Sequence, residues 1–295
     1  MADPQKILVT GATGQLGQLV IEALLGTVPA SAIVAGVRDP AKPAAVALRD
    51  KGVDVRVADY ARPATLASAL EGVDRLLLIS SSEIGKRKEQ HRNVISAAKD
   101  AGVGLIAYTS ILHADTSPLL LAEEHRDTEA ALAEAGVPFV LLRNGWYTEV
   151  FTWRLPLALE HGTLIGAAGE GRISSAARAD YAEAAASVLT GEDHAGRTYE
   201  LAGDTSFTLA ELVAVVSEAS GRPIAYQNLT PDDFKAAVKA GVPEMVATIL
   251  SNTDAGIAKG ALLDDEGELG RLIGRPTTSF RSTITAFIQN PPSPL

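Results

Sequence analysis

Short apolar runs typical of β-strands alternate with amphipathic runs typical of α-helices through the first 143 residues. Strands are expected at Lys6–Thr10, Ala32–Val37, Val53–Ala58, Arg75–Ser80, Gly104–Thr109 and Phe139–Arg143. Helices are expected between them, for example over Arg92–Ala101 and Glu123–Ala135. This order predicts an α/β fold, a Rossmann-type doubly wound parallel sheet built from right-handed βαβ units. Ligands of such sheets bind at the carboxyl ends of the strands.

After Arg143 the alternation weakens, and helical segments dominate from Leu209 to Lys259. We expect residues 1–150 to form the Rossmann domain, with return segments around 178–203. Residues 151–295 are expected to form a smaller, mostly helical lid that binds substrate. The proline-rich end, residues 290–295, is expected to fray.

The glycine-rich stretch "GATGQLG", residues 11–17, directly follows the first expected strand and opens a helix. Gly11 permits a tight turn, Gly14 lets the backbone approach a pyrophosphate, and Gly17 lets the helix pack on the strand. The helix N-terminus offers unpaired N–H groups to phosphates. We therefore expect a dinucleotide at this loop, bound by Gly11, Thr13, Gly14, Gln15, Leu16 and Gly17.

The end of the second strand, "VRDPAK", distinguishes NAD from NADP. An acidic residue here binds the ribose 2′-hydroxyl of NAD, whereas a cation suits the 2′-phosphate of NADP. Asp39 followed by Pro40 is typical of a helix N-cap and first helical residue, which leaves Arg38 and Lys42 for the phosphate. The sequence thus favours NADPH, the alternative being that Arg38 is a surface charge.

Small hydroxyl residues end the fourth strand, where Ser80 is expected to contact the cofactor near the nicotinamide ribose. Ser82 has the alternative role of capping the next helix. The cluster from Lys86 to Lys88 is expected to be a solvated helix face rather than a binding patch.

The composition limits the function classes. The 295 residues carry a net charge of −10 and no cysteine, and they contain neither a run of 18 apolar residues nor a signal-peptide core. These features predict a cytoplasmic protein that binds neither nucleic acid nor membranes and uses no thiol chemistry. No metal-binding spacing such as HExxH occurs, so no metal is expected.

The pair that moves a proton in most short-chain reductases, a tyrosine followed four positions later by lysine, is absent. None of the six tyrosines has a lysine at that distance. A serine, Ser110, does follow the fifth strand, where such enzymes keep one. His113 and His125 are candidates for relaying protons, the alternative being packed or surface histidines.

Segments along essentially the whole chain resemble the NmrA-like atypical short-chain dehydrogenase/reductases, and most closely the type-2 NADPH:quinone oxidoreductases. They include "GATGQLG", "VRDPAK", "LLLISSSEIGKR", "YTSILHADTSPL", "LLRNGWYTE", "AARADYAEAAASVLT" and "LIGRPTT". The resemblance implies a Rossmann domain with a small C-terminal lid, NADPH at the glycine loop and a quinone in the cleft. It also implies that Arg38 holds the 2′-phosphate.

By the same resemblance Asn144, Trp146 and Tyr147 face the nicotinamide and the acceptor. Asn144 and Tyr147, with His125, are therefore the candidate catalytic residues, and Trp146, Tyr147 and Phe151 the candidate substrate-binding ones. The chain departs from the family at Val150 and Phe151, where Asn-Tyr is expected. The other interpretation of "RNGWY" is a glycine turn whose aromatic residues are ordinary core.

Quinone reduction is compatible with the absence of the tyrosine–lysine pair. Hydride addition to a ketone leaves an alkoxide, whose parent acid resembles water with a pKa of about 15.7. Addition to a quinone leaves a phenolate, whose parent acid has a pKa of about 10, as in tyrosine. The expected activity is therefore direct two-electron hydride transfer from NADPH to a quinone, without flavin or metal.

Two other functions stay open. An NmrA-like regulator would sense NADP(H) without turnover, acting through a protein partner. A nucleotide-sugar epimerase or reductase is disfavoured because those enzymes normally keep the tyrosine–lysine pair. The oligomeric state is left open, with a homodimer as the candidate.

Overall fold

The structure is a computed structural model that describes residues 5–291, so the expected fraying of residues 290–295 falls mostly outside it. The chain divides into two compact units. Unit 1 comprises residues 5–114, 123–143 and 181–199, and unit 2 comprises residues 115–122, 144–180 and 200–291. Among the described residues, no helix is long and apolar enough to cross a bilayer.

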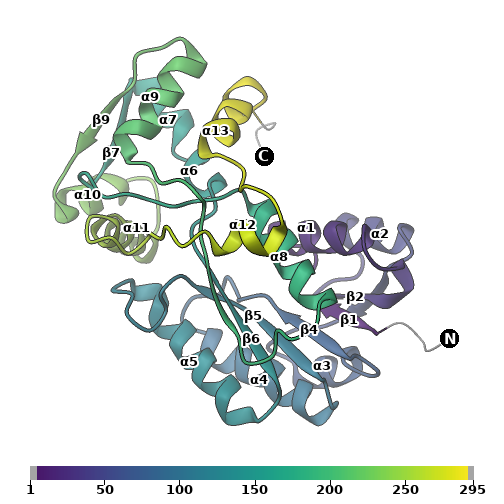
Figure 1. Cartoon of the computed structure of the whole chain (residues 1–295). Coiled ribbons are helices and arrows are strands. Elements are labelled where there is room, and N and C mark those ends of the chain that lie inside the picture. Colours follow the sequence, from purple (N-terminus) through teal and green to yellow (C-terminus); the bar gives the residue numbers. More distant parts are fainter. Residues whose placement is uncertain (1–4, 292–295) are drawn as a thin grey trace. The chain divides into compact units, whose positions relative to one another are not determined.

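A seven-stranded sheet with the order β3-β2-β1-β4-β5-β6-β8 organises unit 1 (Figure 1). Its strands are β1 (Ile7–Val9), β2 (Ile33–Val37), β3 (Asp54–Val57), β4 (Arg75–Leu78), β5 (Leu105–Ile111), β6 (Phe139–Asn144) and β8 (Thr198–Leu201). The pairs β1–β2, β1–β4, β2–β3 and β4–β5 are parallel. The strand order reverses between β1 and β4, which confirms the expected Rossmann-type doubly wound fold.

Helices cover both faces of this sheet (Figure 1). One face carries α3 (Pro63–Ala69), α4 (Arg87–Asp100) and α5 (Leu120–Ala135). The opposite face carries α1 (Gln15–Leu25), α2 (Pro43–Asp50) and α8 (Arg178–Thr190), and a 3₁₀ turn, Ala30–Ala32, leads into β2.

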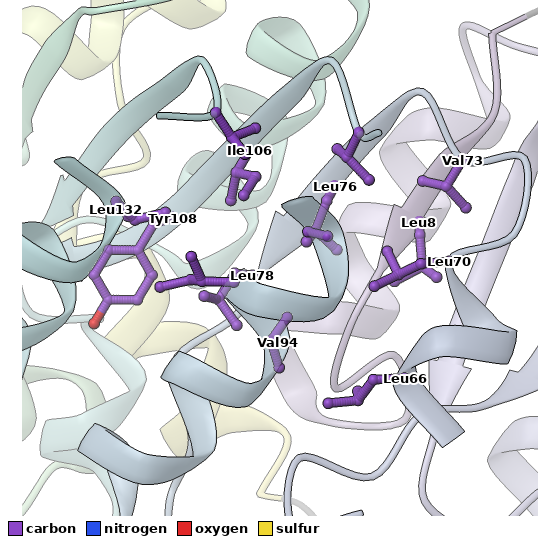
Figure 2. Packing of buried hydrophobic residues seen from close by; sticks show 14 of the residues in the cluster. Leu8, Leu66, Leu70, Val73, Leu76, Leu78, Val94, Ile106, Tyr108 and Leu132 are labelled. Carbon is purple, nitrogen blue, oxygen red and sulfur yellow. The ribbon is translucent and has the colours of Figure 1, made fainter. Parts of the chain in front are cut away.

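The core under α3, α4 and α5 follows from the two-residue period of the strands (Figure 2). Alternate residues of β4 and β5, such as Leu76, Leu78, Ile106 and Tyr108, point to the same face and are fully buried. Leucines and valines of the helices pack against them. Each fully buried leucine or valine stabilises the fold by about 1.5–3 kcal/mol.

Unit 2 is mostly helical, as expected. Its helices are α6 (Glu149–Thr152), α7 (Leu155–His161), α9 (Leu209–Ser220), α10 (Pro231–Val238), α11 (Glu244–Ile257), α12 (Glu268–Ile273) and α13 (Phe280–Gln289). It also contains a two-stranded parallel sheet of β7 (Thr163–Gly166) and β9 (Ala225–Asn228), which the sequence did not predict. The "GRPTT" segment binds the buried Asp180, whose carboxylate accepts hydrogen bonds from Arg275 and Thr278.

Candidate functional site

The three glycines of residues 11–17 each meet a different geometric need. Gly11 adopts φ +59°, a backbone conformation that glycine reaches without strain. Gly14 is the N-cap of α1. A Cβ on Gly17 would lie 2.4 Å from the carbonyl oxygen of Gly11, so only glycine lets α1 pack against the turn. This geometry agrees with the tight turn expected at Gly11 and the helix packing expected at Gly17.

A cavity of about 370 Å³ lies beside this turn, within unit 1. Its lining includes all of the expected cofactor residues: Gly11, Thr13, Gly14, Gln15, Leu16, Gly17, Arg38, Lys42 and Ser80. They come from the turns after β1, β2 and β4, which are neighbours in the sheet. The topological switch between β1 and β4 is where such sheets bind ligands.

Other lining residues escaped the sequence reasoning. Gly36 lies within β2, and a Cβ there would stand 3.1 Å from Ala58 Cβ and 3.3 Å from the Val9 carbonyl oxygen. Tyr60 also lines the cavity, and its hydroxyl donates to the Ile79 carbonyl. The "ADY" segment after the third strand was the available signal, because it too ends a strand at this edge.

The turn after β2 corrects the expectation for Asp39. Helix α2 begins at Pro43 with Lys42 as its N-cap, so neither Asp39 nor Pro40 starts a helix. The Asp39 carboxylate instead accepts from the Ala41 N–H at 2.9 Å, which closes a local turn. Arg38 lines the cavity, and Asp39 is not among its lining residues.

The turn after β4 is held by hydrogen bonds from its backbone N–H groups to side chains. The Ser80 N–H donates to Thr109 Oγ1 at 2.8 Å, and the Ser81 N–H donates to His91 Nε2 at 2.9 Å. Helix α4 begins at Arg87 with Lys86 as its N-cap and no side-chain cap, so the alternative role of Ser82 as a helix cap is wrong.

Arg87 corrects the expectation of a solvated basic face. Lys86 and Lys88 are exposed, but Arg87 is buried and its Nε donates to the Ser81 carbonyl. Its Nη1 lies 3.4 Å from His125 Nε2 and 3.9 Å from Glu124 Oε2. Arg87 is therefore part of the interior of unit 1.

His91 and His125 belong to the same buried group. His125 Nδ1 lies 2.8 Å from the Tyr108 hydroxyl, and His91 Nδ1 lies 2.9 Å from Thr128 Oγ1. Burial, reinforced by the positive charge of Arg87, lowers the pKa of each imidazole to about 3. His125 is thus neutral at neutral pH, and it is not among the residues that line the cavity.

Ser110 is engaged by a buried ion pair. Its hydroxyl donates to Glu129 Oε1 at 2.5 Å, and Arg143 binds both oxygens of the same carboxylate, at 3.0 and 2.8 Å. Glu129 stands four residues after His125 in α5. The Ser110 proton is directed at a carboxylate, which leaves it poorly placed as a donor to a substrate.

The candidate acceptor residues lie in unit 2. Asn144 is the last residue of β6, and its Nδ2 lies 3.5 Å from the Tyr147 hydroxyl. The buried Asn144 Oδ1 has no hydrogen-bond partner within residues 5–291. An amide with one free acceptor, beside a phenol, is suited to binding a polar ligand group.

Tyr147 is positioned by the start of α8. The guanidinium of Arg178 stacks over its ring at 4.8 Å, and the Arg178 N–H donates to the Glu149 carboxylate. Burial raises the pKa of Tyr147, and the Asn144 hydrogen bond and the Arg178 charge partly oppose that rise. Arg178 was not predicted from the sequence, because it begins a helix rather than following a strand.

The remaining candidates differ in burial. Trp146 is half-buried. Phe151 is buried and packs edge-to-face on Phe207, with ring centroids 5.8 Å apart. His113 is half-buried and adopts φ +52°, which is uncommon for a residue other than glycine.

Comparisons with known proteins match most of the length of the chain. The model of the NmrA-like family matches residues 3–259. Quinone oxidoreductase 2 of Escherichia coli K12 is 57% identical over 280 residues, covering 95% of this chain and 97% of that protein.

Two solved structures extend the comparison. The NADPH-dependent quinone oxidoreductase of E. coli, solved with NADPH, superimposes with a TM-score of 0.93 at 56% identity, covering 95% of this chain and 99% of that one. The triphenylmethane reductase of Citrobacter sp., solved with NADP(H), gives a TM-score of 0.90 at 41% identity with the same coverage.

Proposed function

Because the chain belongs to the NmrA-like family, we propose that it is an NADPH-dependent oxidoreductase that reduces quinones by direct two-electron hydride transfer, without flavin or metal. One observation carries this proposal. A quinone oxidoreductase that was solved with NADPH is 56% identical to this chain over 95% of its length.

The cavity of unit 1 fits a dinucleotide phosphate. A Cβ on Gly14 would stand 3.1 Å from the Gly11 carbonyl oxygen, in the wall where we place the pyrophosphate beside the N-terminus of α1. Arg38 and Lys42 supply positive charge at the same cavity, as a 2′-phosphate requires. We assign the 2′-phosphate to Arg38, with Lys42 beside it.

Bound NADPH supplies a hydride, and the protein has to orient the acceptor and stabilise the charge that forms on its oxygen. We propose that the Asn144 amide and the Tyr147 hydroxyl donate hydrogen bonds to that oxygen, and that Trp146 stacks on the quinone ring. His125 is buried and neutral, so we propose that it acts through Tyr108 and Arg87 rather than as an acid.

We infer that the protein works in the cytoplasm with a small-molecule quinone as its partner. A homodimer is the proposed assembly, which light scattering after size exclusion would test. Substrate binding is assigned to residues 151–295 together with the Asn144–Tyr147 segment.

The test uses purified protein, NADPH and a panel of benzoquinones and naphthoquinones beside simple ketones. The loss of the nicotinamide absorbance band reports turnover. Quinones should be reduced while ketones stay almost untouched, because a phenolate needs no strong acid and an alkoxide does. Tight NADPH binding without any quinone turnover would contradict the proposal and favour the NADP(H)-sensing regulator.

A further inference from the structure

Three charged side chains form a row at the cofactor cavity of unit 1. Arg38 Nη1 lies 3.2 Å from Glu83 Oε1, and Lys86 Nζ lies 3.3 Å from the other carboxylate oxygen, Glu83 Oε2. Arg38 follows β2, whereas Glu83 lies in the turn after β4. Both Arg38 and Glu83 line the cavity. One carboxylate therefore joins the two turns beside the same cavity.

The guanidinium of Arg38 is the group to which we assign the 2′-phosphate, and Glu83 already engages it. A phosphate and a carboxylate seek the same N–H donors of a guanidinium, so they compete for it. The side chains of Arg38 and Glu83 are 68% and 37% exposed, so their ion pair is weak enough to exchange. A displaced Glu83 would keep Lys86 as its partner.

We propose that Glu83 sets the cofactor preference of this enzyme, because its carboxylate competes with the 2′-phosphate of NADPH for Arg38. Lys86 moderates this competition by holding the opposite carboxylate oxygen. NADH carries no 2′-phosphate, so its binding is independent of the exchange. The inference rests on the proposed function, since it takes NADPH as the cofactor and Arg38 as the ligand of its 2′-phosphate.

The first test compares dissociation constants for NADPH and NADH, measured by isothermal titration calorimetry. Glu83→Gln should tighten NADPH binding by about two- to fivefold, the range that an exposed ion pair is worth, and leave NADH unchanged. Lys86→Gln should weaken NADPH binding, because Glu83 then has Arg38 as its main cation. Glu89→Gln is the matched control: it removes an exposed carboxylate in the first turn of α4, and it should change neither constant.

The second test repeats Glu83→Gln in an Arg38→Gln background. If Glu83 acts by competing for Arg38, its replacement should no longer tighten NADPH binding there. If Glu83→Gln still tightens NADPH binding in the absence of Arg38, the proposal is overturned, because the carboxylate of Glu83 would then repel the phosphate directly. Equal tightening of NADPH and NADH would also overturn it. Failure of the unsubstituted protein to bind NADPH would instead overturn the proposed function, and this inference with it.

Discussion

The hydroxyl of Tyr147 lies beside the Asn144 amide, the Arg178 guanidinium stacks over the Tyr147 ring, and burial raises the pKa of Tyr147. A phenol with a raised pKa is a weaker acid but still a good hydrogen-bond donor. At the scale of single residues, this environment suits stabilisation of a phenolate better than proton transfer to an alkoxide.

We therefore predict that Tyr147→Phe slows single-turnover reduction of a benzoquinone by roughly two- to tenfold, the effect of one lost hydrogen bond. A dedicated general acid would cost on the order of 10²–10⁴-fold. Tyr226→Phe, which removes another hydroxyl of unit 2, should leave the rate unchanged. A thousandfold loss at Tyr147 would show that a proton donor exists after all.

The motif glycines and Arg38 line the cavity. The sequence could indicate this position because it depends on neighbours in the chain, the strand before and the helix after. The burial of Arg87 could not, because it depends on Ser81, Glu124 and His125, which reach it through the tertiary fold. In the sequence, a run of three basic residues looks the same whether its middle residue is exposed or buried.

At the scale of elements, α4 and α5 are joined by buried polar side chains. The Ser81 N–H donates to His91 Nε2, so the proton of His91 lies on Nδ1 and is donated to Thr128 of α5. His125 accepts from Arg87 at Nε2 and therefore donates to Tyr108 of β5 through Nδ1. Both arrangements require a neutral imidazole.

This requirement predicts acid sensitivity. The folded pKa of each histidine, about 3, lies below its unfolded value of 6.5, so the unfolded chain binds more protons between those pH values. The free energy of unfolding should fall below about pH 6.5 by roughly 1.4 kcal/mol per pH unit for each histidine, and this loss should end near pH 3.

Urea unfolding between pH 7 and 5 measures this slope. His125→Gln keeps a donor and an acceptor without a titrating ring, so its slope should be shallower than that of the unsubstituted protein. His161→Gln is the control, because it removes an exposed imidazole that lies outside this buried group. Equal slopes for His125→Gln and the unsubstituted protein would refute the prediction.

Elements differ in how far the sequence predicts them. Most strands of the large sheet could be predicted because they are short apolar runs. Six were expected near their observed places, and the seventh, β8, lies in the expected return segment around 178–203. The start of α2 was misplaced because Asp39-Pro40 and Lys42-Pro43 offer two similar beginnings, of which the fold uses the second. Strands β7 and β9 escaped because β9 is polar and largely exposed, and the two pair across about 60 residues.

At the scale of the whole molecule, the cofactor cavity belongs to unit 1 alone and gathers the turns after β1, β2, β3 and β4. The order in which these strands join the sheet brings the four turns to one edge. The βα alternation predicts this convergence, because parallel strands all end at the same edge. The contact between Arg38 and Glu83, 45 residues apart, is a detail that only the folded chain supplies.

NADPH binding should stabilise the sheet edge that carries the turns after β1, β2, β3 and β4 more than the rest of the protein. NADPH at 100 times its dissociation constant should add about 2.7 kcal/mol to the free energy of unfolding of the unit that binds it. We predict that NADPH slows hydrogen exchange most in the segments 11–17, 36–42, 58–60 and 79–83, which contain most of the residues that line the cavity.

Mass spectrometry of exchanging amides, with and without NADPH, measures this protection. Gly102, Gly104, Leu105 and residues 191–195 line a separate hollow at the opposite ends of the strands and serve as an internal control that should change little. NADH at the same concentration should protect less at 36–42, because it offers no phosphate to Arg38. Protection spread evenly over the chain would contradict a cofactor site confined to these turns. A cofactor bound at the turns should slow exchange mainly at the amides that it orders directly.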